Sequence, residues 1–133
     1  MGKKIVITGG LGYIGTELCK IYSGISWNNT IVVIDNRFIS ERVNQIRNWN
    51  MNFVHGDILD KELINKYCKN ADVVHHLAGI TDVPRTKSES NQEKDNLIKI
   101  VAEKGTQNIL DAISDNCKII FPSTHVVYEG IEK

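Results

Sequence analysis

The stretch IVITGGLGYIG, residues 5–15, decides the fold. Its first three residues are apolar and β-branched, which is typical of a strand that is buried on both faces. Gly10, Gly12 and Gly15 then satisfy the spacing G-x-G-x-x-G. Counted from Gly9, the same stretch also satisfies G-x-x-G-x-x-G. It therefore predicts a strand that runs into a tight, glycine-rich turn at the start of a helix.

A glycine-rich turn of this kind suits the diphosphate of a dinucleotide. The turn favours residues that tolerate a positive φ, and a diphosphate can approach a backbone that carries no Cβ. The free N–H groups and the dipole of the helix start then bind its negative charge. A P-loop would instead end in Gly-Lys-Ser/Thr, whereas residues 15–17 are Gly-Thr-Glu. The turn is therefore expected to bind a dinucleotide.

An acidic residue follows the turn at the distance that dinucleotide-binding folds use, about 20 residues. This residue is Asp35, at the end of a second apolar run at 31–34. Its carboxylate can accept hydrogen bonds from a ribose 2′-hydroxyl, whereas it would repel a 2′-phosphate. We therefore expect NAD rather than NADP as the cofactor, although Arg37 is close enough to weaken that preference.

Short apolar runs alternate with helical patterns along the chain. After the first strand, further strands are expected at residues 31–34, 52–55, 73–74 and 119–121. Helices are expected around the patterns at residues 14–21, 42–48, 60–68 and 98–113. This order predicts a Rossmann-type, doubly wound α/β sheet of about five parallel strands. We expect one domain over residues 1–133.

The helical patterns also predict local details. The first helix is expected to bury Ile14, Leu18 and Ile21, which recur at helical spacing. Asp60 precedes the third helix and is a candidate N-cap. Residues 81–94 are polar and charged, so we expect a loop there before the long helix.

The composition excludes several classes of partner. Lys plus Arg and Asp plus Glu both number 16, and a chain with zero formal charge offers no electrostatic basis for binding nucleic acid or an anionic membrane. No apolar run approaches the roughly 18 residues of a membrane span, and the first residues lack the apolar core of a signal peptide. We therefore expect a cytoplasmic protein with no nucleic-acid or membrane partner.

The cysteines and histidines form no metal-binding pattern. Cys19, Cys68 and Cys117 are odd in number and far apart, so we expect reduced thiols. His75 and His76 are adjacent on a strand, and adjacent strand residues point to opposite faces. They could not easily chelate one ion, and we expect no metal.

Six short motifs follow one another along the chain. They are TGGLGYIG at 8–15, IDN at 34–36, GDI at 56–58, HLAG at 76–79, GTQNIL at 105–110 and FPSTHVVY at 121–128. Together they resemble the motifs of the extended short-chain dehydrogenase/reductase family, especially its nucleotide-sugar epimerases and dehydratases. The resemblance spans nearly the whole chain, and it implies that the sheet is truncated relative to the family, whose sheet continues past the fifth strand.

The resemblance implies how the cofactor is held. The first motif holds the diphosphate, and the end of the second strand holds the adenosine ribose. An Asp side chain and the next backbone group read the adenine edge, and the segment after the fourth strand lines the middle of the cofactor and the nicotinamide ribose. The implied cofactor contacts are Gly9, Gly12, Tyr13, Ile14, Gly15, Asp35, Asn36, Asp57, Ile58, Leu77, Ala78 and Gly79.

The resemblance also implies the chemistry. In the family, NAD removes hydride from a sugar carbon, a Tyr with a Lys four residues later takes the hydroxyl proton, and a Ser or Thr holds the reacting oxygen. Aligned on residues 127–128, this hydroxyl is Thr124, with Ser123 as its neighbour. No Tyr of this chain has a Lys four residues later, and Ala102 replaces an Asn of the family's long helix. Arg85 is a candidate contact to a substrate phosphate.

These observations favour one function over its alternatives. We expect the NAD-binding portion of a nucleotide-sugar epimerase/dehydratase-type oxidoreductase, part of a longer protein and inactive by itself because the Tyr-x-x-x-Lys pair is absent. The alternative is a non-catalytic NAD(H)-sensing or regulatory module. A flavin- or S-adenosylmethionine-binding protein would explain the glycine turn but not the motifs at 56–58 and 123–124. An uncovered apolar strand at 119–121 would invite pairing with another chain, which predicts self-association.

Overall fold

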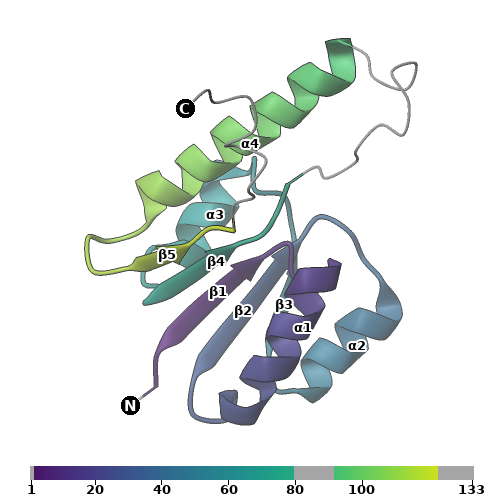
Figure 1. Ribbon diagram of the computed structural model, residues 1–133. Helices are drawn as coiled ribbons and strands as arrows, with labels where there is room; N and C mark the ends of the chain where they lie inside the picture. Colours follow the sequence, from purple (N-terminus) through teal and green to yellow (C-terminus); the bar gives the residue numbers. More distant parts are fainter. Residues whose placement is uncertain (1, 80–91, 123–133) are drawn as a thin grey trace, which may run out of the picture.

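Five parallel strands make one sheet with helices on both faces. The computed structural model describes residues 2–79 and 92–122, so Arg85, Ser123 and Thr124 lie outside the described residues (Figure 1). The strands are β1 (Lys4–Thr8), β2 (Thr30–Asp35), β3 (Asn52–His55), β4 (Val73–His76) and β5 (Lys118–Ile120). The helices are α1 (Tyr13–Tyr22), the short 3-10 helix η1 (Ser23–Ile25), α2 (Ser40–Asn48), α3 (Lys61–Cys68) and α4 (Gln92–Ala112).

The strand order is β3-β2-β1-β4-β5, and every pairing is parallel. β1 lies at the centre, where Ile5 pairs in register with Ile31 of β2 and with Val73 of β4. The chain adds β2 and β3 on one side of β1 and then crosses to the other side. In open α/β sheets, ligands bind at the carboxyl ends of the strands beside such a reversal. The predicted Rossmann-type fold is confirmed.

The helices cover the sheet in two layers. α1 and α2 lie over one face, and α3 and α4 lie over the other (Figure 1). Because successive strand residues point to opposite faces, Ile5 and Ile7 pack toward α1 and α2, whereas Val6 packs toward α3 and α4. Both faces of the central strands are therefore covered, which explains their uninterrupted β-branched runs.

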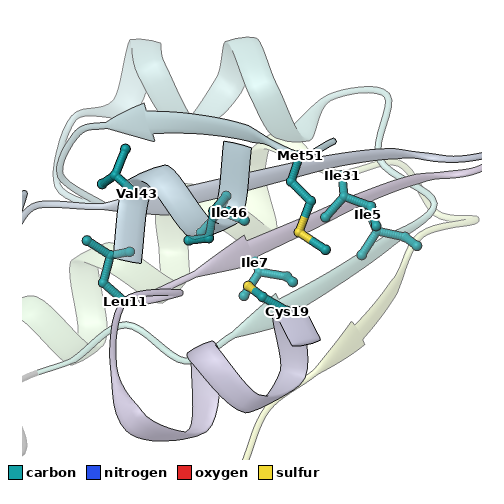
Figure 2. Packing of buried hydrophobic residues seen from close by; sticks show 9 residues of the cluster. Ile5, Ile7, Leu11, Cys19, Ile31, Val43, Ile46 and Met51 are labelled. Atoms are coloured by element: carbon teal, nitrogen blue, oxygen red, sulfur yellow. The ribbon is translucent and has the colours of Figure 1, made fainter. Parts of the chain in front are cut away.

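Two hydrophobic clusters hold the layers together. The first buries Ile5, Ile7, Leu11, Cys19, Ile31, Val33, Val43, Ile46 and Met51 (Figure 2). The second buries Val6, Val32, Ile34, Ile58, Ile64, Cys68, Ala71, Val74 and Ile109. Leu11 belongs to the glycine turn and is fully buried, and burying such a side chain contributes roughly 1.5–3 kcal/mol. The core thus anchors the turn itself.

The face that α1 buries differs from the sequence prediction. Apolar spacing predicts that Ile14, Leu18 and Ile21 face the core, but Ile14 is 66% exposed and Ile21 is 75% exposed. The buried residues of α1 are Gly15 and Cys19. Gly15 packs against the backbone of the glycine turn, and this contact sets the rotation of the helix. The prediction is therefore wrong for Ile14 and Ile21.

Two helix starts can be compared with their predictions. Asp60 caps α3 as predicted, because its Oδ1 accepts a hydrogen bond from the N–H of Leu63 at 3.1 Å. α4 already begins at Gln92, so the prediction of a loop over residues 81–94 is wrong for its last three residues. Residues 96 and 97 of α4 are exposed, and a polar sequence does not oppose a helix at the surface. No helix in the described ranges is long and apolar enough to cross a membrane.

β5 forms one edge of the sheet as described. It pairs with β4, and within the described residues its other edge pairs with no strand. Ile120 and the following Phe121 are exposed. Self-association through this edge stays a prediction.

Candidate functional site

The carboxyl ends of β1, β2 and β4 meet at the glycine turn that follows β1. Gly9 has a φ of 70°, a conformation that favours glycine. Its N–H donates to the carbonyl of Ile34 at 2.7 Å, and the N–H of Gly12 donates to the carbonyl of Gly9 at 3.1 Å. These bonds fix the turn at the edge of the sheet where the strand order reverses.

The turn is packed backbone against backbone. A Cβ added to Gly9 would lie 2.7 Å from the backbone nitrogen of Ala78. A Cβ added to Gly15 would lie 2.5 Å from the carbonyl oxygen of Gly9. Side-chain carbons do not approach backbone atoms so closely, so both positions require glycine. This is the close packing of helix on strand that the glycine spacing predicts.

The N-terminus of α1 offers free backbone donors at this edge. Gly12 is the N-cap residue and has no side chain with which to cap the helix. Within residues 2–79 and 92–122, the N–H groups of Tyr13, Ile14 and Gly15 donate to no acceptor. Free N–H groups and the positive end of the helix dipole attract anions. The site can therefore receive a phosphate or a diphosphate.

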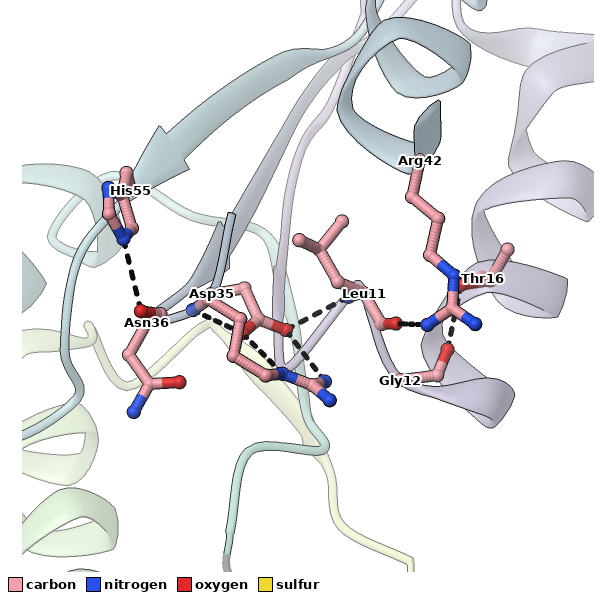
Figure 3. A network of polar contacts seen from close by, with 8 residues as sticks. Leu11, Gly12, Thr16, Asp35, Asn36, Arg42 and His55 are labelled. Carbon is pink, nitrogen blue, oxygen red and sulfur yellow. Dashed lines mark hydrogen bonds and ion pairs between the residues drawn. The ribbon is translucent and has the colours of Figure 1, made fainter. Parts of the chain in front are cut away.

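Asp35 ends β2 directly beside the turn (Figure 3), and its side chain is only 3% exposed. Its Oδ2 accepts the N–H of Leu11 at 3.0 Å. Its Oδ1 accepts the backbone N–H of Arg37 at 2.9 Å and the Nε of Arg37 at 3.2 Å. The Arg37 guanidinium thus covers the carboxylate, although the Arg37 side chain is 54% exposed. The carbonyl of Asn36 accepts a hydrogen bond from His55 Nε2 at 3.0 Å.

A second arginine reaches the turn from α2. Arg42 Nη1 donates to the carbonyl of Leu11 (Figure 3). The guanidinium of Arg42 lies 5.7 Å from the centre of the Tyr13 ring, within the range of a cation–π contact. The role of Arg42 could not be predicted from the sequence, because the hydrogen bond joins residues 31 positions apart and no motif includes Arg42. Two arginines therefore flank the free helix terminus.

The residues predicted at the adenine edge follow β3 and lie next to Asp35. The N–H of Gly56 donates to the carbonyl of Asp35 at 3.0 Å. Asp57 Oδ1 accepts the N–H of Leu59 at 2.9 Å, so its carboxylate already stabilises the local turn. The side chain of Ile58 is buried in the second hydrophobic cluster. The Ile58 carbonyl accepts a hydrogen bond from Asn108 Nδ2 at 2.9 Å, so among the described residues the backbone N–H of Ile58 is the group left for a ligand.

The segment after β4, Leu77–Gly79, lies against the glycine turn. The N–H of Leu77 donates to the carbonyl of Thr8, and the N–H of Ala78 donates to Thr8 Oγ1, each at 3.1 Å. A Cβ added to Gly79 would meet no described atom within 4 Å. The surface above Gly79 is therefore open, next to the turn.

The two adjacent histidines point to opposite faces of the sheet. His75 Nε2 lies 2.6 Å from Tyr22 Oη on the α1 side. His76 Nδ1 lies 2.8 Å from Thr8 Oγ1, and His76 Nε2 lies 3.1 Å from Thr106 Oγ1 of α4. Burial lowers the pKa of both imidazoles, which are therefore neutral at pH 7. In the part of the chain that the structure describes, no three His, Cys, Asp or Glu side chains gather at a metal-binding distance.

The structure brings most of the predicted cofactor contacts to one edge of the sheet. The glycine turn contacts Asp35 through Leu11 and contacts Ala78 through Gly9. The segment at 56–58 is held to β2 by the hydrogen bond from the Gly56 N–H to the carbonyl of Asp35. The predicted catalytic hydroxyls lie at 123–124, outside the described residues.

Comparison with known proteins places this geometry in a family. The sequence model of the 3-beta hydroxysteroid dehydrogenase/isomerase family matches residues 6–132. The CDP-paratose 2-epimerase of Salmonella typhi is 35% identical over 142 residues, covering 98% of this chain and 39% of the epimerase. The dTDP-D-glucose 4,6-dehydratase of Dictyostelium discoideum is 31% identical over 134 residues, covering 95% of this chain and 30% of the dehydratase.

A solved structure shares the fold. The UDP-glucose-4-epimerase of Stenotrophomonas maltophila, with bound NAD and formylated UDP-arabinopyranose, superposes with a TM-score of 0.75 at 24% identity, covering 95% of this chain and 38% of the epimerase. The chain thus spans about 39% of the length of the Salmonella epimerase. The predicted resemblance is confirmed, and the chain belongs to the 3-beta hydroxysteroid dehydrogenase/isomerase family of extended short-chain dehydrogenases/reductases.

Proposed function

We propose that the chain is the NAD-binding region of a nucleotide-sugar epimerase/dehydratase-type oxidoreductase. The observation that carries the proposal is the free start of α1 with the Asp35 carboxylate beside it. In dinucleotide-binding folds these two features hold the diphosphate and the adenosine ribose of one ligand. The names of the relatives, epimerases and dehydratases of nucleotide sugars, support the class of reaction.

The glycine turn fits a diphosphate. The N–H groups of Tyr13 and Ile14 have no described acceptor and would each donate to a phosphate oxygen. Gly12 keeps side-chain atoms away from that path, and Arg42 adds positive charge beside the Tyr13 ring. NAD, when bound, supplies the hydride acceptor of the reaction. The residues of this chain bind the cofactor and orient it.

Asp35 would hold the adenosine ribose once Arg37 turns aside. A carboxylate has lone pairs for about four hydrogen bonds, and Asp35 already accepts four N–H groups, two of them from the Arg37 side chain. The Arg37 side chain is 54% exposed, so it can turn into solvent, whereas the buried Asp35 carboxylate keeps the backbone N–H groups of Leu11 and Arg37. Rotation of Arg37 would free two acceptor positions on Asp35, which the ribose hydroxyls would then occupy.

Asp35 and Arg37 together determine the preference between NAD and NADP. A 2′-phosphate would be repelled by Asp35 but attracted by Arg37, which lies on the carboxylate. We propose that NAD binds more tightly and that NADP still binds.

The remaining contacts follow the arrangement of the loops. Asn36 lies next to the ribose position, and Asp57 and the Ile58 backbone lie on the adenine side. Beyond the diphosphate, Leu77, Ala78 and Gly79 would line the middle of the cofactor, where the surface above Gly79 is open.

Catalysis in this class of enzyme needs a general base beside the hydroxyl that holds the reacting oxygen. We propose Thr124, with Ser123, as the hydroxyl that positions the reacting oxygen of a nucleotide sugar. No Tyr of the chain has a Lys four residues later, and a general base of this kind contributes typically 10²–10⁴-fold to the rate. We therefore propose that the chain by itself binds NAD without turnover. We also propose that it is cytoplasmic and self-associates. A NAD(H)-sensing module would use the same residues, and a reading frame that continues into Tyr-x-x-x-Lys would exclude it.

Isothermal titration of the full chain with NAD and with NADP tests the proposal. We expect saturable NAD binding, weaker NADP binding, and at least about tenfold weaker NAD binding in Asp35→Asn, because a charged hydrogen-bond acceptor is lost. Asp115→Asn changes an exposed carboxylate after α4 and should bind NAD as the wild type does. A folded wild type that binds neither dinucleotide, or an unchanged affinity in Asp35→Asn, would contradict the proposal.

A further inference from the structure

We infer that His76 is held as the neutral Nε2–H tautomer and is a positioning residue that joins α4 to the proposed cofactor site. His76 is 2% exposed at the carboxyl end of β4. Its Nδ1 lies 2.8 Å from Thr8 Oγ1, and its Nε2 lies 3.1 Å from Thr106 Oγ1. One imidazole thus bridges β1 and α4. The effect on NAD rests on the proposed function, whereas the tautomer is a property of the chain alone.

The hydrogen atoms of this bridge can be assigned by counting donors and acceptors. Thr8 Oγ1 accepts the N–H of Ala78 at 3.1 Å, so its own hydrogen needs a further acceptor. Thr8 is fully buried, and His76 Nδ1 is the acceptor that the described residues offer. Nδ1 must then be unprotonated. The hydrogen of the neutral ring lies on Nε2, from which it is donated to Thr106 Oγ1.

The opposite tautomer would leave a buried donor unsatisfied. An Nδ1–H would donate to Thr8 Oγ1, and the hydroxyl hydrogen of Thr8 would then have no acceptor among the described residues. Unsatisfied buried donors are rare in proteins because they lose their bonds to water without replacement. A doubly protonated ring creates the same conflict, and burial lowers the pKa of His76 in agreement with a neutral ring.

The donor in the hydrogen bond between Thr8 and His76 matters, because Thr8 sets the spacing between the glycine turn and residues 77–79. The Thr8 hydroxyl holds the N–H of Ala78, and Gly9 follows Thr8 directly. Gly9 is packed so closely on Ala78 that an added Cβ would lie 2.7 Å from its nitrogen. When His76 orients the Thr8 hydroxyl, the glycine turn and residues 77–79 keep one relative position. His76 would therefore act on a cofactor through Thr8 and Ala78, without touching it.

The tautomer can be measured without any cofactor. In the ¹⁵N-labelled full chain, two-bond proton–nitrogen correlations of a histidine ring distinguish its protonated nitrogen from its unprotonated nitrogen. At neutral pH we expect a protonated Nε2 and an unprotonated Nδ1 in His76. A protonated Nδ1 would overturn the inference, whether or not the chain binds NAD.

Variants test the positioning role. Thr8→Val keeps the shape of the side chain but removes its hydroxyl, and Thr8→Ser restores the hydroxyl. We expect faster hydrogen exchange of the Ala78 amide and an NAD dissociation constant about tenfold higher in Thr8→Val, the effect of one lost hydrogen bond. Thr8→Ser should return both quantities toward wild type. Thr106→Val should move both in the same direction as Thr8→Val, by a smaller amount.

Two outcomes of the variant series would overturn the inference. One is an Ala78 exchange rate in folded Thr8→Val that equals the wild-type rate. The other is a Thr106→Val chain in which neither quantity changes. If the wild type does not bind NAD, the proposed function fails, and the ring nitrogens and the Ala78 exchange rates still decide the inference.

Discussion

Replacing Gly15 with alanine has a cost that follows directly from the packing of the glycine turn. A Cβ at this position would lie 2.5 Å from the carbonyl oxygen of Gly9 and 2.6 Å from the Cα of Gly10. Both are backbone atoms, so α1 would have to move away from the turn. Overpacking of this kind costs about 1–3 kcal/mol, and the better helix propensity of alanine returns at most about 1 kcal/mol. Because these contacts are with backbone atoms below 2.7 Å, the overpacking cost lies at the upper end of its range, and we expect the free energy of unfolding to fall by about 1–2 kcal/mol.

Gly24→Ala is the matched control for this substitution. A Cβ at Gly24 would meet no described atom within 4 Å, so the free energy of unfolding should change by less than about 0.5 kcal/mol. Urea unfolding followed by circular dichroism measures both variants. Moving α1 also moves the N–H groups of Tyr13 and Ile14, so the NAD dissociation constant of Gly15→Ala should rise at least about tenfold. A Gly15→Ala chain that matches Gly24→Ala in stability and NAD affinity would refute the reasoning.

Other expected effects concern buried and charged groups. Burial lowers the pKa of His75 and His76, so below about pH 6.5 the unfolded chain binds more protons than the folded chain. The free energy of unfolding in urea should therefore decrease as the pH falls below about 6.5, and a flat profile from pH 8 to 5 would be inconsistent with neutral buried rings. Arg37→Ala should widen the preference for NAD over NADP in calorimetric titration, because the cation on the buried carboxylate is lost; a narrower preference would show that Arg37 does not attract the 2′-phosphate. Burial raises the pKa of Cys19 to about 12, so a disulfide reagent at pH 8 should modify the partly exposed Cys117 first, and the reverse order by mass spectrometry would argue against the buried placement of Cys19.

The strands and the place of Asp35 could be predicted from the sequence for one physical reason. Strands covered on both faces need apolar side chains at every position, so residues 5–7, 31–34 and 73–74 stand out as uninterrupted β-branched runs. They lie within β1, β2 and β4. Because β1 and β2 pair in parallel, their carboxyl ends share one edge, which brings Asp35 to the glycine turn.

The rotation of α1 could not be predicted from apolar spacing. Ile14, Leu18 and Ile21 form a plausible buried stripe, yet the contact of Gly15 with the turn rotates Ile14 and Ile21 to the surface. A glycine has no side chain to mark it as the closest contact. Only the packed structure identifies that face.

The side-chain hydrogen bonds around the site could not be predicted from the sequence either. Strand alternation places His75 and His76 on opposite faces, but the partners of His76 lie 68 and 30 residues away. Arg42 likewise reaches Leu11 across 31 residues. Such contacts depend on where crossovers place a helix over the sheet, and no local pattern encodes that placement. The roles of Ser123 and Thr124 stay predictions.

The central claim is that the glycine turn and Asp35 together hold NAD, and an amide-shift titration tests it most directly. Adding NAD to the ¹⁵N-labelled chain and following each assigned amide locates the bound dinucleotide along the sequence. We predict saturable shifts concentrated at Tyr13 and Ile14, at Asp35 and at residues 77–79. A folded chain without saturable shifts, or with shifts confined to the opposite edge of the sheet, around Lys4 and Asp72 at the amino ends of β1 and β4, would contradict the account.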